Sequence, residues 1–293
     1  MKARFLFIIL MLLIGQIKSQ TLYVVYSTNL NGYLEPCECP ATFLGGMTRV
    51  LTAIKQLRIA HPDLLLVDSG DFFKSYTLPA ANWLMLEMMH SARLDAVSLG
   101  EQELVEGSDF LVRGIQHFPL SIVSCNLKID HQEKIYSFSP VILEKTNHKI
   151  GIIGLVEPDC FEDTFYKNIV LTPIEQVLPE ILSSLRPQVD LLIVVYHAAF
   201  EQAVKLAEDY PSIDVIIAGH SQETAQKQIG RQIVLQNGYD GEYLGILKID
   251  FHENGFRFTH ESLPIDDSFQ EDLYFREKIR QAFPHMGESP QGK

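Results

Sequence analysis

Polar side chains that could bind a ligand or a metal ion fall in five short segments, and each segment directly follows an apolar run that is typical of a β-strand. The segments are residues 27–32, 68–71, 100–103, 196–197 and 219–222. Carboxylates and imidazoles, the side chains that bind divalent metal ions, are among them. Open α/β sheets place their sites beyond the carboxyl ends of the strands, so this pattern indicates one site at one sheet edge.

In this order and spacing, the five segments resemble the calcineurin-like metallophosphoesterases, specifically the catalytic domain of periplasmic 5'-nucleotidases and UDP-sugar hydrolases. The resemblance extends to the stretches LLLVDSGDFF, DAVSLGEQELVEG, PSIDVIIAGHSQ and VLQNGYDGEYLG, and it covers residues 21–267. It implies an α/β fold of four layers, an α-β-β-α sandwich. It also implies a centre of two metal ions, bridged by an aspartate, that together activate a water molecule against a bound phosphate.

The resemblance places the ligands of the first metal ion on Asn29, Asn31, Asp71 and Gln222. Three of these side chains are neutral amides, where the family has an aspartate and two histidines. Amides are poor ligands for transition metals beside carboxylates and imidazoles. The first metal site is therefore expected to be degenerate.

The ligands of the second metal ion fall on Asp71, Glu101, His197 and His220, and all four side chains can bind a metal ion. We therefore expect one divalent transition metal ion, which would be Zn, Mn or Fe. Glu101 stands where the family has an asparagine. The alternative for this residue is that its longer side chain turns outward and pairs with Arg49.

The general acid of the family, a histidine, falls on Gln102, whose amide cannot transfer a proton near neutral pH. A general acid typically contributes ~10²–10⁴ in rate. We therefore expect weak or no phosphoester hydrolysis and a binding role toward a small phosphorylated ligand or an exported partner protein. The alternative is an active single-metal hydrolase that acts on a small phosphorylated substrate, in which Tyr33 or Glu35 would have to replace the missing proton donor.

Four cysteines permit two disulfides, and they are Cys37, Cys39, Cys125 and Cys160. The segment LEPCECP, which carries the first two, resembles the EPCGCP text of a subgroup within the family. All four follow expected strands, so they lie at the sheet edge that carries the expected site. Structural disulfides are the ordinary expectation in an exported chain. The alternative is that the cysteines supply thiolate ligands where the first metal ion has been lost.

Strand and helix signals alternate over most of the chain, which predicts stacked β-α units. The expected strands are residues 21–27, 64–67, 96–99, 121–124, 191–195 and 215–218, with further strands over 232–261. The expected helices are residues 47–60, 78–93, 108–116, 176–185, 200–209 and 268–283. Residues 136–144 and 149–155 are expected to pair as a hairpin with Asn147 in the turn.

The first 19 residues are typical of a secretory signal peptide, because Lys2 and Arg4 precede an apolar run. That run is too short for a membrane span, which takes roughly 20 apolar residues. We expect an exported protein, periplasmic or secreted, without an integral membrane span after cleavage. Residues 20–267 would form the metallophosphoesterase-like domain and residues 268–293 a C-terminal helix and frayed tail. The C-terminal nucleotide-binding domain of the family's nucleotidases is expected to be absent.

The composition excludes one class of partner. With 46% hydrophobic residues in 293, the chain has the composition of a packed globular protein. Its formal charge is −13, from 24 basic and 37 acidic residues. Nucleic-acid binders need clustered Lys and Arg to displace counterions from phosphates, so no nucleic acid is expected as a partner.

Overall fold

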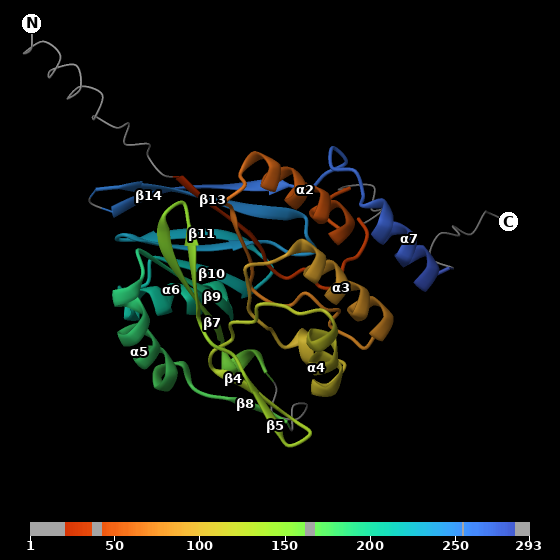
Figure 1. Ribbon diagram of the computed structural model, residues 1–293, viewed down its shortest axis with the longest axis horizontal. Helices are drawn as coiled ribbons and strands as arrows, with labels where there is room; N and C mark the ends of the chain where they lie inside the picture. The colour runs from red at the N-terminus through yellow and green to blue at the C-terminus, as the bar shows by residue number, and fades with distance from the viewer. Residues whose placement is uncertain (1–20, 37–42, 162–167, 254, 285–293) are drawn as a thin grey trace, which may run out of the picture.

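Two β-sheets lie at the centre of the molecule (Figure 1). The structure is a computed structural model that describes residues 21–36, 43–161, 168–253 and 255–284. The expected signal peptide, Cys37, Cys39 and the end of the tail lie outside the described residues. In the described part of the chain, no helix has the length and apolar character to cross a membrane.

The first sheet contains β1 (Thr21–Ser27), β2 (Leu65–Asp68), β3 (Ala96–Val97), β13 (Tyr243–His252) and β14 (Gly255–Pro264). Its spatial order is β14-β13-β1-β2-β3. The second sheet contains β6 (Val141–Lys145), β7 (His148–Val156), β9 (Leu191–Ala198), β10 (Val215–His220), β11 (Thr224–Ile229) and β12 (Gln232–Asn237). Its order is β11-β12-β10-β9-β7-β6.

Alternating side chains of the strands fill two different cores, because successive residues of a strand point to opposite faces. In β9, Leu191, Ile193 and Val195 pack into the core between the two sheets. Leu192 and Val194 point the other way, into the core beneath helices. All five are fully buried, and each such side chain contributes about 1.5–3 kcal/mol on leaving water. Burial on both faces explains why the central strands are continuous apolar runs.

Helices cover the outer face of each sheet. The first sheet is covered by α2 (Met47–Ala60), α3 (Pro79–Ala92), α4 (Ser108–His117) and α7 (Leu273–Ala282). The second is covered by α5 (Ile174–Leu185) and α6 (Phe200–Asp209). Figure 1 shows these two groups of helices on opposite sides of the sheets. The predicted four-layer α-β-β-α sandwich is confirmed.

Parallel pairing brings the polar segments to one edge of the molecule. In the first sheet β1, β2 and β3 are parallel, and in the second β7, β9, β10 and β12 are parallel. The carboxyl ends of each set therefore point the same way. The loops after β1, β2 and β3 meet the ends of β9 and β10 there, as the sequence predicts.

The predicted hairpin and the last helix begin or end at other residues than expected. Pro140 has no N–H for the ladder, so the expected strand 136–144 is divided into β5 (Lys134–Ser137) and β6, and only β6 pairs with β7. β5 joins a third sheet with β4 (Leu127–His131) and β8 (Ile169–Leu171), which was not predicted.

The Asp272 carboxylate accepts hydrogen bonds from the N–H groups of Tyr274 and Phe275, and this cap starts α7 at Leu273 rather than at 268.

The expected strand 121–124 is instead a linking segment between the two sheets. It makes one bridge to each sheet, from Ile122 to Val97 of β3 and from Ser124 to Gly154 of β7. A Cβ atom added at Gly154 would lie 2.5 Å from the backbone carbonyl carbon and oxygen of Val123. The two sheets can approach this segment only because residue 154 has no side chain.

Replacement of Gly154 by alanine is therefore expected to destabilise the protein by ~1–3 kcal/mol, the usual range for overpacking a core. Urea denaturation followed by circular dichroism measures this change. Gly151→Ala is the matched control in the same strand, because its added methyl meets only side-chain atoms, at 3.1 Å and beyond. Equal stability of Gly154→Ala and the wild-type protein would show that the linking segment is not tightly packed.

Candidate metal centre

The residues of the predicted site come from both sheets and meet where the strands end. Asp71 follows β2 and Glu101 follows β3 of the first sheet, while His197 lies in β9 and His220 ends β10 of the second. Gly219 pairs with His197 in the parallel register, so the two histidines lie on neighbouring strands. Their rings are 5.4 Å apart at an interplanar angle of 81°. The fold thus brings together all four expected ligands of the second metal ion.

Unusual backbone conformations turn several of these side chains inward. Five predicted site residues have positive φ angles between 49° and 84°, and they are Asn29, Asn31, Asp71, His220 and Gln222. The left-handed region is uncommon for residues other than glycine, although Asn, Asp and His are enriched there. Backbone strain of this kind clusters at functional sites. It provides evidence for a site that does not depend on the sequence motifs.

The His197 side chain is wholly buried and fixed in one orientation. Its Nδ1 lies 2.9 Å from the backbone carbonyl of Ser69, which can only accept, so Nδ1 carries a hydrogen and donates. Nε2 then faces Glu101 Oε2 at 2.8 Å and Asp71 Oδ1 at 3.5 Å. A backbone carbonyl that accepts from one ring nitrogen, with the other nitrogen turned toward a metal site, is typical of a metal-binding histidine.

Charge at this point must be balanced by a cation. Burial lowers the pKa of His197, but Asp71 and Glu101 outweigh that effect and raise the pKa to about 10. Burial also raises the pKa of Asp71. Two carboxylates and an imidazole nitrogen within hydrogen-bond distance need a proton or a metal ion between them.

His220 and Cys160 complete a group of four donors. His220 Nδ1 lies 3.3 Å from Glu101 Oε1 but, within the described part of the chain, this buried atom makes no hydrogen bond. Cys160 ends the short 3-10 helix η2 (Pro158–Cys160), which follows β7. Its Sγ and ligand atoms of Glu101, His197 and His220 all lie within 4.8 Å of one another. Two imidazoles, a carboxylate and a thiol form a donor set that fits one tetrahedral transition metal ion.

The structure describes two of the four cysteines, Cys125 and Cys160. From the sequence, Cys160 is expected either in a disulfide or as a thiolate that replaces ligands of the first metal ion. The structure instead places it beside the second-metal residues, with a free thiol. Cys125 also carries a free thiol, and its Sγ contacts the Val123 carbonyl rather than the centre. Burial, followed by the charges of Glu101 and Asp71, raises the pKa of the Cys160 thiol, so its ionisation requires a nearby cation.

Asn31 and Asp71, two of the expected first-metal residues, are joined in a hydrogen-bond network with Gln102. Gln102 Nε2 donates to Asn31 Oδ1 at 3.2 Å and to Asp71 Oδ2 at 3.0 Å, and Asn31 Nδ2 donates to Asp240 Oδ1 at 2.8 Å. Asn29 is fully buried, and its Oδ1 accepts from the backbone N–H of His220 at 2.6 Å. Gln222 is exposed and stands apart from this network. Hydrogen bonds thus join Gln102 to Asn31 and to Asp71, and Asn31 to Asp240.

The alternative partner of Glu101 does not apply. The carboxylate points toward His197 and His220, while the Arg49 guanidinium donates to the Phe43 carbonyl. The side chains of both histidines hold the pKa of Glu101 low, against the desolvation that would raise it.

Glu103 is a positioning residue that the sequence analysis did not single out. Its buried carboxylate accepts hydrogen bonds from the backbone N–H groups of Gly100, Asp71, Phe72 and Phe73, at 2.6–3.0 Å. This carboxylate ties the loop after β2 to the loop after β3. The sequence does show a second acidic residue two positions after Glu101. Its burial among backbone N–H groups depends on the folded structure and cannot be predicted from one sequence.

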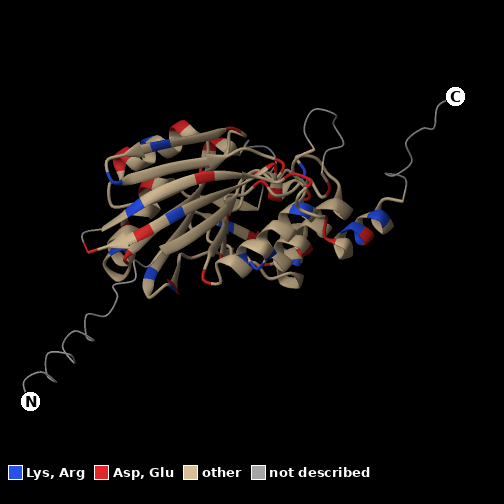
Figure 2. Ribbon diagram, turned by 90° about the horizontal axis from the view of Figure 1, so that it is seen from above, with Lys and Arg blue, Asp and Glu red and all other residues tan. Residues whose placement is uncertain are grey.

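The centre is acidic as a whole. Figure 2 shows a group of acidic positions where the strands converge. Carboxylates that act on the candidate ligands include Asp71, Glu101, Glu103, Glu157 and Asp159, and Asp240 interacts with Asn31. Burial raises the pKa of Asp68 to about 7, and its carboxylate accepts from Ser27 and from the Gly70 N–H, which makes it a structural group. Lys74 Nζ lies over the Tyr33 ring at 3.8 Å, at the Asp240 side of the centre.

Comparisons with known proteins agree with this arrangement. Mouse 5'-nucleotidase is 26% identical over 276 residues, which cover 81% of this chain and 47% of the mouse protein. The trifunctional nucleotide phosphoesterase YfkN of Bacillus subtilis is 25% identical over 286 residues, or 81% of this chain and 20% of that protein. The chain spans about half the length of the 5'-nucleotidases that it matches. No family model matches the chain.

Solved structures show the same fold. A 5'-nucleotidase precursor from Thermus thermophilus superposes with a TM-score of 0.79 at 20% identity, covering 90% of this chain and 58% of that one. The calcineurin-like phosphoesterase YfkN of Bacillus subtilis superposes with a TM-score of 0.73 at 20% identity, covering 90% and 97% of the two chains. Through these distant homologues and structural neighbours, the chain is similar to the 5'-nucleotidase family of the calcineurin-like metallophosphoesterase superfamily.

Proposed function

We propose that this protein is an exported 5'-nucleotidase-like binding protein that holds one divalent metal ion and has weak or no phosphoester hydrolysis. The observation that carries the proposal is the hydrogen-bonded network of Gln102, Asn31 and Asp71. It occupies the positions at which the family resemblance implied a metal ion and a general acid. Export, to a periplasm or outside the cell, rests on the basic and apolar character of residues 1–19.

The donor set supports one metal ion of a particular kind. Thiolate and imidazole ligands suit zinc better than manganese, which prefers oxygen ligands. Cys160 would take the place expected for Asp71, so that Cys160, His197, His220 and Glu101 would hold the ion. The hydrogen bond from His197 Nδ1 to Ser69 would orient that ring. Four protein ligands around zinc are typical of closed, structural sites, whereas catalytic sites keep one position open. A closed site would favour a structural ion over a catalytic one.

The remaining residues also favour binding over hydrolysis. Gln102 cannot donate a proton to a leaving group, and its side chain is fixed by two hydrogen bonds. A phosphate would meet the carboxylates of Asp71, Glu101 and Asp240 unless a cation offsets them. A bound metal ion would supply that charge, and Lys74 would add a second at the rim. Binding of a small phosphorylated ligand should therefore depend on the metal ion.

Purified mature protein is expected to contain about one equivalent of metal, with zinc favoured by the donors. Inductively coupled plasma mass spectrometry measures the content of the wild-type protein and of a His197→Ala, His220→Ala variant. The variant should lose the metal because it lacks two of four ligands. A His61→Ala, His90→Ala variant, altered away from the centre, is the matched control. No metal in the wild-type protein, or equal metal in all three, would overturn the proposal.

The cobalt-substituted protein is expected to show a thiolate-to-cobalt charge-transfer band that Cys160→Ser removes and Cys125→Ser retains. Loss of the Cys160 ligand should weaken metal affinity by more than about tenfold. Loss of a group that only orients a ligand already weakens metal affinity by about tenfold or more. Competition with a chelator measures the affinity. Mass spectrometry under non-reducing conditions checks the thiol state beforehand. A band that persists in Cys160→Ser would exclude this sulfur as a ligand.

Metal-loaded protein is expected to bind AMP without hydrolysing it at a rate above that of the His197→Ala, His220→Ala variant. Calorimetry measures binding, and phosphate release measures turnover. The metal-free protein should not bind, because its centre is acidic, and Lys74→Gln should bind less tightly. Metal-dependent turnover that the double variant loses would favour the active single-metal hydrolase instead. Absence of AMP binding at any metal loading would leave an exported partner protein as the ligand class to test.

A further inference from the structure

A cavity lies at the opposite edge of the sheets from the candidate metal centre. Its volume is ≈ 400 Å³, within the range of about 300–1,000 Å³ that small-molecule sites occupy. Asp190 and Asp214, which line it, directly precede β9 and β10, whereas the histidines of the centre lie at the other ends of these strands. A strand of this length separates the two sites by roughly 20 Å.

One wall of the cavity is aromatic. Phe251 and Phe256 come from the hairpin of β13 and β14, in the first sheet. The Phe251 ring stacks on His148 of β7 in the second sheet, with centroids 3.7 Å apart and planes at 9°. The Phe256 ring stands edge-on to Phe251, at 6.2 Å and 79°. Both sheets therefore contribute to a rigid surface against which a flat ring can pack.

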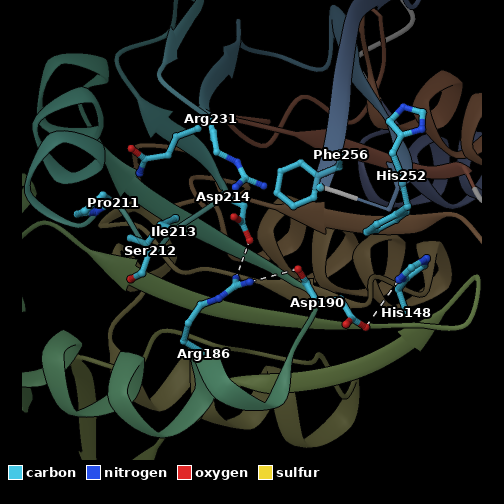
Figure 3. Close-up of a pocket in the computed structure, with 13 residues that line it drawn as sticks. His148, Arg186, Asp190, Pro211, Ser212, Ile213, Asp214, Arg231, His252 and Phe256 are labelled. Atoms are coloured by element: carbon cyan, nitrogen blue, oxygen red, sulfur yellow. Dashed lines mark hydrogen bonds and ion pairs between the residues drawn. The ribbon is translucent and has the colours of Figure 1, made fainter.

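The two arginines of the cavity differ in their partners (Figure 3). The Arg186 Nη1 donates to Asp214 Oδ2 at 2.6 Å, and Nη2 donates to the Asp190 carbonyl, so its charge is neutralised. The Arg231 guanidinium instead points toward Phe256, with Cζ 6.0 Å from the ring centroid. No carboxylate of the described residues lies within ion-pair distance of Arg231, although its charge favours the ionised form of Asp214 in the same cavity. Its planar fork of donors remains available to an anion.

The Arg231 guanidinium lies close to the backbone of Gly255. A Cβ added at Gly255 would lie 2.5 Å from a terminal nitrogen of Arg231, which is the movable end of that side chain. The charge of the ligand is limited by the two aspartates. Asp190 is 55% exposed at its side chain, and a second negative charge on the ligand would meet it and Asp214. A single carboxylate suits the fork of Arg231 better than a dianionic phosphate.

We propose that this cavity binds an organic monocarboxylate that carries a flat ring. The carboxylate pairs with the two-pronged guanidinium of Arg231, and the ring packs against Phe256 and the stacked pair of Phe251 and His148. This site is separate from the metal centre. Its occupancy does not require the metal ion on which the proposed function depends.

Calorimetric titration with 2-naphthoate tests the assignment, with 2-naphthyl phosphate and 2-naphthalenemethanol as probes of the same ring and different charge. We expect saturable binding of 2-naphthoate, with the phosphate and the neutral alcohol weaker. Arg231→Gln should weaken 2-naphthoate binding by about tenfold or more through loss of a charged hydrogen-bond donor. Arg231→Lys keeps the positive charge but loses the planar guanidinium, so its affinity for 2-naphthoate should lie between those of the wild-type protein and Arg231→Gln. Phe256→Ala should weaken all three probes.

The matched control is Arg257→Gln, which removes the neighbouring exposed arginine of β14 from the other face of the strand. It should leave binding unchanged. Binding should also persist in the His197→Ala, His220→Ala variant, which separates this proposal from the metal proposal. Each of four results would overturn the proposal. The first two are no saturable binding of 2-naphthoate and tighter binding of 2-naphthyl phosphate than of 2-naphthoate. The other two are unchanged affinity in folded Arg231→Gln and loss of binding in the double histidine variant.

Discussion

The hydrogen bonds of the buried Glu103 carboxylate are the interaction on which the candidate centre depends. Four backbone N–H groups from two loops converge on its two oxygens. A buried carboxylate is tolerated only with such donors, and it in turn fixes both loops. Asp71 and the residues from Gly100 to Gln102 take their positions from this one group. The loops that carry Asp71 and Glu101 are therefore held in place by these hydrogen bonds.

Under the proposed function, substitution within this frame would change the chemistry of the site without changing its shape. Gln102, Asn31 and Asn29 fill their positions and satisfy neighbouring donors and acceptors, so the loops keep the conformations that the fold requires. Folds commonly outlast the reactions that they carry. The similarity to 5'-nucleotidase structures fits this view, because it extends over 90% of the chain at only 20% identity.

Most of the layers and the positions of His197 and His220 were predictable, because continuous apolar strands followed by polar residues mark the edge of a parallel sheet. The third sheet was not, because its strands are short and Pro140 interrupts the pattern. Cys160 could be placed after a strand from the sequence. Its contact with the histidines depends on β7 lying beside β9, which is a long-range pairing that no local pattern encodes. The amide network depends likewise on side-chain orientations.

The origin of the metal-binding residues in two different sheets has a mechanical consequence. Glu101 belongs to the first sheet, and Cys160, His197 and His220 to the second, so an ion held by all four would cross-link the two halves of the sandwich. Its binding free energy would then add to the free energy of unfolding, since the separated sheets cannot form the site. Under the proposed function, the supply of the metal ion would therefore affect how long the folded protein persists.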